Sequence, residues 1–178
     1  MREIGLLGPA EDAVAEEFSD LFARTAIRVR GYLRRHCDAP DLDDLLSEVY
    51  LVAWRRGDEV PEDPLPWLLA VARRVLANYW RGRDRRERLS TELRCLHGLA
   101  SEPDVAGCAV TRATMLDALA GLTAADRELR LLVGWDGLDS EALARVLGSS
   151  AGAARTRLNR ARQRLEDGLA VDRKEGLK

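Results

Sequence analysis

The stretch DSEALARVLGSSAGAARTRLNRARQRL, residues 139–165, decides the fold of this chain. Asp139 is placed to cap a short helix, Gly148 to end that helix, and Ser150 to cap a second one. The apolar side chains of the second helix recur every three or four residues, which predicts that they pack inward. They are Ala154, Leu158, Ala161 and Leu165. Two helices joined by such a turn predict a helix-turn-helix.

The outward face of the second helix is strongly basic. Its residues are Arg155, Thr156, Arg157, Asn159, Arg160, Arg162 and Arg164. A helix that is merely solvated normally mixes acids with bases, whereas no acid lies between Ser149 and Leu165. The small residues 151–153 let the start of the helix approach a groove, where its N–H groups can meet a phosphate. We therefore predict that this helix binds DNA, with a solvated charged surface as the alternative.

In the rest of the chain, almost every segment with periodic apolar residues predicts a helix. The alternating β-branched runs that are typical of strands are absent. The expected helices span about 14–36 (in one or two pieces), 42–56, 66–81, 115–119, 123–133, 140–147 and 151–169. Three prolines and four acids in 57–66 predict a loop. From residue 82 to residue 110, glycines and a proline break the periodicity, which predicts a linker.

The sequence therefore predicts an all-α protein with two small helical domains joined by a linker, the C-terminal domain being the helix-turn-helix. The expected boundaries are a tail at 1–13, a first domain at 14–88, a linker at 89–110, a second domain at 111–170 and a tail at 171–178.

Charge is segregated along the chain. The 178 residues are 46% apolar and 33% charged, with a net charge of −2, so the chain as a whole is not a basic nucleic-acid binder. Acids dominate 11–20 and 38–48, whereas arginines crowd into 81–88 and 155–164. One acidic docking surface and two basic surfaces can therefore coexist near zero net charge.

The residue content argues against several other classes of protein. Cys37, Cys95 and Cys108 are few and far apart, so we expect a reducing cytoplasm, no disulfide and no cofactor. A metal site of these cysteines with His97 is the less favoured alternative, since the two-residue spacing of strong zinc sites is missing. We expect no signal peptide and no membrane insertion. We also expect no catalytic residues and no enzyme, with His36 and His97 on the surface.

Two surfaces of the predicted first domain require partners. Asp43, Asp44 and Glu48 lie on the outer faces of the 42–56 helix and would repel DNA, so they indicate either a basic protein partner or simple solvation. The 66–81 segment mixes aromatic and basic residues, which suits unstacked bases and a single-strand backbone. They are Trp67, Tyr79 and Trp80 with Arg73, Arg74 and Arg81. The alternative for the tryptophans is a place in the core.

Three segments in this order resemble the extracytoplasmic-function sigma factors, the smallest group of the sigma-70 family. DLDDLLSEVYLVAWRR (41–56) is similar to the family's core-polymerase-binding helix. PWLLAVARRVLANYWRGRDRR (66–86) is similar to its promoter-melting and −10-reading helix. The segment 116–165, which ends in the helix-turn-helix quoted above, is similar to its −35-reading domain.

The resemblance implies an all-helical factor that binds promoter DNA and core RNA polymerase, at the clamp of the β′ subunit and the flap of the β subunit. It also makes an anti-sigma factor a candidate partner. For core binding it implies Asp43, Asp44, Leu45, Glu48 and Val49. For the −10 element it implies Trp67, Arg73, Arg74, Asn78, Tyr79 and Arg81, with the loop 58–65 capturing a flipped base. For the −35 element it implies Arg155, Thr156, Arg157, Asn159, Arg160 and Arg162.

Some positions depart from the family's pattern. Ser47 stands where glutamine is usual, and Arg74 where asparagine is frequent. Ser149 replaces a hydrophobic turn residue, and Ala153 and Ala154 replace a Thr-Val pair, which predicts a less stable C-terminal domain. The predicted function is an alternative sigma factor that recruits polymerase, opens DNA and starts transcription. The alternative is a stand-alone helix-turn-helix regulator, although neither a dimer seam nor a ligand pocket is evident.

Overall fold

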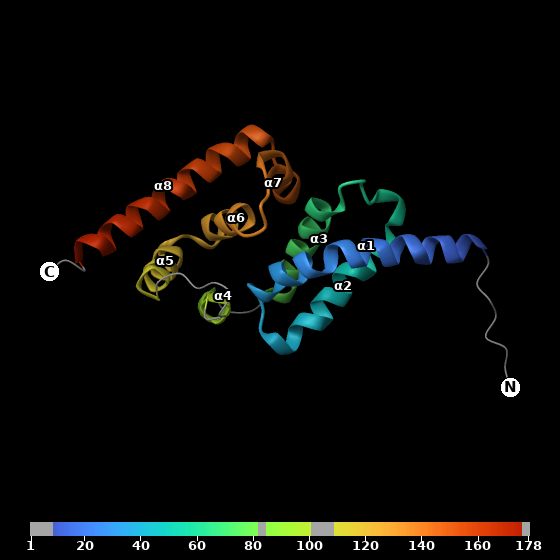
Figure 1. The fold of residues 1–178 in the computed structure, drawn as a ribbon, viewed down its shortest axis with the longest axis horizontal. Coiled ribbons are helices and arrows are strands. Elements are labelled where there is room, and N and C mark those ends of the chain that lie inside the picture. The colour runs from blue at the N-terminus through green and yellow to red at the C-terminus, as the bar shows by residue number, and fades with distance from the viewer. Residues whose placement is uncertain (1–8, 82–84, 101–108, 176–178) are drawn as a thin grey trace.

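A computed structural model describes residues 9–81, 85–100 and 109–175 of the chain. All regular structure in these ranges is helical, which confirms the predicted all-α fold (Figure 1). The α-helices are α1 (Pro9–Arg34), α2 (Leu42–Arg55), α3 (Pro64–Tyr79), α4 (Arg85–Ala100), α5 (Ala109–Gly121), α6 (Ala124–Gly134), α7 (Ser140–Leu147) and α8 (Ala151–Glu175). Short 3-10 helices, Ala39–Asp41 and Gly57–Glu59, precede α2 and α3.

An apolar core lies between α1, α2 and α3. The predicted stripe of α2 is confirmed, and its buried members include Leu42, Leu45, Val49 and Ala53. The side chains that are 0% exposed on the facing helices are Val29 and Leu33 of α1 and Leu68, Leu69 and Ala72 of α3. Helix α3 begins two residues earlier than expected, at Pro64. Both Pro64 and Pro66 are tolerated there because amides in the first turn have no intrahelical partner.

The helix-turn-helix forms as the sequence predicts. The carboxylate of Asp139 caps α7 by accepting hydrogen bonds from the backbone N–H groups of Glu141 and Ala142, at 3.0 and 2.7 Å. Gly148 ends α7 in the left-handed region, at φ +62°, where a residue with a side chain would be strained. The Ser150 hydroxyl then accepts from the amide three residues later, at 3.2 Å. The predicted caps and stop are confirmed.

The second domain packs directly against the first. Helix α7 lies on α3, and one hydrophobic cluster continues from α1–α3 into α6–α8. In that cluster Leu132 of α6 and Leu143 of α7 are 0% exposed. Helix α8 extends away from this contact (Figure 1). The two predicted domains therefore lie against each other in this structure.

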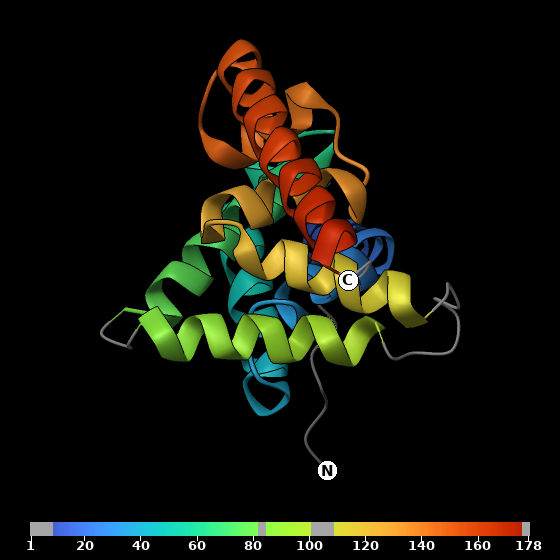
Figure 2. The same ribbon diagram turned by 90° about the vertical axis from the view of Figure 1, so that its left-hand side faces the viewer.

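Residues 85–100, most of which belong to the predicted linker, form helix α4, which the sequence analysis did not predict. Thr91, Glu92 and Leu96 of α4 are buried, and α4 runs beside α5 (Figure 2). The expected tails are also too long, because α1 begins at Pro9 and α8 continues to Glu175. The remaining parts of these predicted segments, 1–8, 82–84, 101–108 and 176–178, lie outside the described residues.

Candidate nucleic-acid and polymerase interfaces

The first half of α8 presents the predicted base-reading residues on one exposed surface. Arg155, Arg157, Asn159 and Arg160 are exposed, and none makes a hydrogen bond or ion pair to another described residue. The Thr156 hydroxyl donates to the carbonyl oxygen of Gly152 at 2.9 Å, which leaves its lone pairs able to accept. Ala154 and Ala161 are 0% exposed on the opposite face. The inward and outward faces of α8 are as the sequence predicts.

The later arginines of α8 are engaged within the protein. Arg162 donates to Glu166 at 2.8 Å, and this hydrogen bond raises the pKa of Arg162. Arg164 of α8 pairs with the buried Asp126 of α6. Arg162 therefore reaches a phosphate only after releasing Glu166. Arg164 is exposed, as predicted, but its ion pair with Asp126 ties the two helices together.

The helix-turn-helix core contains one of the predicted weak points. The Ser149 hydroxyl is buried and has no hydrogen-bond partner among the described residues, which costs stability that a hydrophobic turn residue would not. Ala154, by contrast, is fully enclosed. The unfavourable position is therefore the turn, whereas the small residue on α8 is well packed.

Helix α3 exposes part of its predicted basic and aromatic surface. Arg74 and Asn78 are exposed, and Arg81 donates to the side-chain oxygen of Asn78 at 2.8 Å. Tyr79 is half-buried and donates its hydroxyl to Asp41 at 2.6 Å. These contacts leave one edge of Tyr79 and the Arg81–Asn78 pair on the surface.

The tryptophans of this segment belong to the core rather than to an open stacking surface. Trp80 is 7% exposed and donates its indole N–H to the carbonyl oxygen of His36 at 3.0 Å. Trp67 is half-buried and packs against the main cluster. The alternative interpretation holds for Trp80, and Trp67 offers only part of its ring.

Arg73 forms an ion pair with the second domain. Its Nε donates to both carboxylate oxygens of Glu128 in α6, at 3.0 and 3.2 Å. Its side chain keeps 43% of its surface exposed, whereas that of Glu128 keeps only 10%. Arg73 therefore remains partly exposed, but its Nε is engaged by Glu128.

The acidic surface of α2 is confirmed as exposed, but two predicted members are not on it. Leu45 and Val49 are 6% and 0% exposed, because they belong to the inward stripe, so they support the surface from beneath. Asp43 pairs with Arg30 of α1. Asp44 and Glu48 are exposed, with no hydrogen bond or ion pair to another described residue.

Sequence analysis missed two apolar side chains of α2. Leu51 and Trp54 are each 51% exposed, and they follow Glu48 at helical spacing along the same helix. Large apolar side chains on an exposed face indicate an interaction surface. The available signal was that neither residue fits the inward stripe at 42, 45, 49 and 53.

Two parts of the chain match models of known families. Sigma-70 region 2 matches residues 21–86, and Sigma-70, region 4 matches residues 112–165. The RNA polymerase sigma factor CarQ of Myxococcus xanthus is 31% identical over 159 residues, which cover 88% of this chain and 91% of CarQ. The chain belongs to the extracytoplasmic-function sigma factors of the sigma-70 family.

This sigma factor binds core RNA polymerase and promoter DNA and directs transcription initiation. The ECF RNA polymerase sigma factor SigL of Mycobacterium tuberculosis is also similar, at 27% identity over 158 residues, 83% of this chain and 81% of SigL. A stand-alone helix-turn-helix regulator is not supported, because region 2 of a sigma factor precedes the helix-turn-helix. Below, region 2 denotes α1–α3 and region 4 denotes α5–α8.

Two solved structures share this fold. CnrH in complex with the cytosolic domain of CnrY has a TM-score of 0.62 at 22% identity, covering 92% of this chain and 96% of CnrH. The sigma factor RpoE in complex with the anti-sigma factor NepR from Bartonella quintana has a TM-score of 0.63 at 24% identity, covering 88% and 99%. These likenesses confirm the all-helical architecture with regions 2 and 4.

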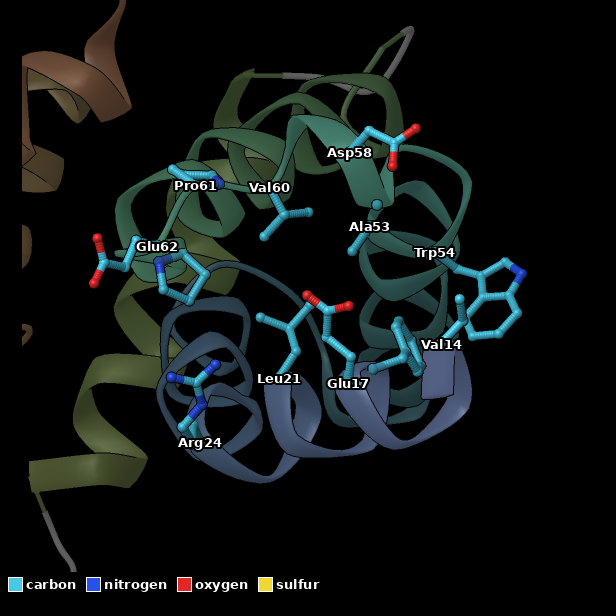
Figure 3. Close-up of a pocket in the computed structure, with 13 residues that line it drawn as sticks. Val14, Glu17, Leu21, Arg24, Ala53, Trp54, Asp58, Val60, Pro61 and Glu62 are labelled. Carbon is cyan, nitrogen blue, oxygen red and sulfur yellow. The ribbon is translucent and has the colours of Figure 1, made fainter. Parts of the chain in front are cut away.

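Region 2 of this sigma factor contains a cavity beside the proline-rich loop (Figure 3). The cavity measures about 480 Å³, within the range of sites for small organic groups. Leu21 of α1 and Val60 of the loop point into it, and Trp54 of α2 lies at its edge (Figure 3). Arg24 and Glu62 supply opposite charges at the rim. The loop predicted to capture a base therefore lines a hollow, together with α1, which the sequence did not indicate.

The described residues contain no group of three or more His, Cys, Asp or Glu side chains placed to hold a metal. Cys37 and Cys95 are unpaired thiols, and burial raises the pKa of Cys37 to about 12. Cys108 lies outside the described residues.

His36 is buried beside Glu92, at 3.4 Å, so its expected surface position was wrong, whereas His97 is exposed. No described helix is long and apolar enough to cross a membrane.

Proposed function

We propose that region 2 docks on core polymerase through the surface of α2 that carries Asp44, Glu48, Leu51 and Trp54, here called the docking face. The observation that carries this proposal is the combination of two unpaired carboxylates with two exposed apolar side chains. Carboxylates steer a basic partner and fix its orientation, and buried apolar contacts supply affinity. The family resemblance points to the clamp of the β′ subunit as this partner, and to the flap of the β subunit for region 4.

The DNA-binding surfaces follow from the two basic helices. Arg74, Asn78 and Tyr79 of α3 hold the nontemplate strand together with Arg81, which follows the helix. Arg73 joins them fully once Glu128 has left it. The cavity of Figure 3 receives a flipped base, because it is hollow and adjoins the loop before α3. Arg155, Thr156, Asn159 and Arg160 of α8 read the −35 major groove, and Arg157 and Arg162 contact phosphates.

The protein acts in the cytoplasm by binding rather than by catalysis in this proposal, and an anti-sigma factor regulates it. The RpoE structure, solved with the anti-sigma factor NepR, supports the last point. The same α2 docking face is a surface that such a regulator would need to cover in order to block core binding.

The test is run-off transcription with purified core polymerase and a promoter library, together with core-binding measurements. Reversing the charges in Asp44→Lys/Glu48→Lys should weaken core binding by tenfold or more while leaving helicity unchanged, since both side chains are exposed. A matched control is Glu16→Lys/Asp20→Lys, which reverses two exposed carboxylates at the same spacing on α1. Equal losses in both double variants would show that net charge, and not the docking face, determines binding.

A further inference from the structure

Region 4 places a carboxylate on a basic residue of the proposed strand-binding surface. Glu128 of α6 accepts from Arg73 of α3 through both of its oxygens, and from the hydroxyl of Tyr32 of α1 at 2.7 Å. Both hydrogen bonds come from Nε of Arg73, a donor that arginine also offers to phosphate oxygens. Glu128 therefore competes with a strand phosphate for the Nε edge of Arg73, whose side chain is otherwise 43% exposed.

A second ionic contact fixes the same seam. Arg35, in the turn that follows α1, is 1% exposed and pairs with Asp136, which lies between α6 and α7. The Arg35 guanidinium also lies 5.7 Å from the ring centroid of Tyr32 and 5.8 Å from that of Trp135. Its charged partner and one of its two aromatic partners thus come from region 4. Arg28 adds a hydrogen bond to the carbonyl oxygen of Asp136.

This seam is suited to separate and re-form. Burying an arginine costs free energy because its charge loses contact with water. In the closed state the ion pair with Asp136 offsets this cost, and when the domains separate water solvates the arginine again. Interfaces between domains of one chain are typically polar enough to allow such motion. At the edge of the seam, Arg145 of α7 and Asp63 before α3 form an exposed ion pair of 2.6 Å. Several of its contacts are therefore reversible in water.

The geometry of a promoter requires the seam to open. The names of the two elements place them about 25 base pairs apart, which is about 85 Å of duplex at 3.4 Å per base pair. Helix α7, beside the −35-reading helix, lies directly on α3, the proposed −10 helix. Both elements cannot be bound while α7 stays on α3, so the promoter-bound protein must be more extended than this structure.

We propose that the chain has an autoinhibited closed state in which Glu128 and Asp136 of region 4 hold the arginines of region 2, and Glu128 competes with the nontemplate strand for Arg73. This competition rests on the proposed role of α3 in strand binding. The −35-reading face of α8 and the docking face of α2 stay exposed in the closed state. Closure therefore engages Arg73 of the melting surface, while Arg74 and Asn78 stay exposed.

The experiment compares the full-length chain with Glu128→Gln and Glu128→Gln/Asp136→Asn. Small-angle X-ray scattering measures extension, and fluorescence anisotropy measures affinity for a single-stranded oligonucleotide carrying the nontemplate −10 sequence. Loss of the charge of Glu128 should shift the open-to-closed ratio at least about tenfold toward open, because hydrogen bonds to charged groups contribute that much to an equilibrium. The affinity for the oligonucleotide should rise by the same factor, up to full opening.

The matched control is Glu141→Gln, which removes one exposed carboxylate from α7 of the same region. It should scatter and bind as the unmodified chain does. Tyr32→Phe is a second test that keeps the packed ring and deletes only the hydroxyl that Glu128 accepts, so it should open the chain more weakly in the same direction. Circular dichroism monitors helicity throughout.

Scattering that stays unchanged in the double variant and in Tyr32→Phe would overturn the closed state. Extension without tighter oligonucleotide binding would overturn the competition for Arg73. Run-off transcription with core polymerase separates these outcomes from a failure of the proposed function, because a chain that supports promoter-dependent transcription acts as a sigma factor whether or not it closes.

Discussion

Replacing single arginines along α8 should separate base reading from phosphate contact. Arg155 and Asn159 are exposed one turn apart on α8, a rise of about 6 Å that corresponds to roughly two base pairs. Arginine binds guanine through two hydrogen bonds, and asparagine binds adenine likewise, each contributing about 1–3 kcal/mol of discrimination. Arg155→Ala should therefore weaken binding to the preferred −35 sequence about 5- to 150-fold. The loss should vanish at duplexes already altered at the contacted base pair.

Arg162→Ala should behave differently, because Arg162 lies two turns further along and is already paired with Glu166. That pair is exposed and screened by water, so it opposes the release of Arg162 to a phosphate only weakly. The variant should weaken all duplexes alike and lower the slope of log K against log salt by about one unit.

The assay is equilibrium binding of holoenzyme to a panel of single-substituted −35 duplexes at several salt concentrations. If Arg155→Ala and Arg162→Ala weakened binding equally for every duplex of the panel, the division of α8 into a base-reading half and a phosphate-binding half would be refuted. Base readout would then belong to region 2.

Two further predictions concern stability. Arg164→Ala should lower the free energy of unfolding by about 1–3 kcal/mol, because it leaves the buried Asp126 carboxylate unpaired. Urea unfolding measures this loss, and it should be much smaller for the control variant Arg162→Ala. Equal losses in the two variants would contradict a stabilising role for the Arg164–Asp126 pair. Burial alone would raise the pKa of Glu92, but hydrogen bonds and charge from His36 and Arg88 outweigh it and lower the pKa to about 2. The contribution of Glu92 to the unfolding free energy should therefore be constant above about pH 5.5 and fall by up to about 3 kcal/mol toward pH 2. Glu92→Gln should remove this part of the pH dependence.

The helix-turn-helix could be predicted from sequence because local signals determine it. Asp139, Gly148 and Ser150 act on backbone groups within a few residues of themselves, so their roles can be inferred without knowledge of the rest of the fold. The inward stripe of α8 is equally local, since helical spacing alone aligns Ala154 with Ala161. The exposed basic face follows from the same spacing.

Helix α4 could not be predicted in this way. Leu89, Leu93 and Leu96 do recur at helical spacing, but Leu89 is 39% exposed and the polar Thr91 and Glu92 are buried, so the buried face is not the apolar one. The helix is stabilised by contacts with distant segments. Glu92 of α4 pairs with Arg127 of α6 at 3.1 Å and lies beside His36, in the turn after α1, at 3.4 Å. These partners are 35 and 56 residues away in sequence. Such long-range pairs leave no spacing signal. The same limit explains why the sequence placed Arg73 on an open surface, since its partner Glu128 is 55 residues away.

The exposed and covered surfaces of the closed chain together define an order of events. The docking face of α2 and the reading face of α8 are exposed, so core polymerase and duplex DNA can each be engaged before the domains separate. Arg73, which would hold the opened strand, is the one described arginine of α3 under a region 4 carboxylate. Binding of the −35 duplex by α8 on a polymerase-held chain would draw α7 away from α3 and remove Glu128 from Arg73. The strand-binding surface would thus become complete only when both domains are already on the promoter, which limits binding to unrelated single strands.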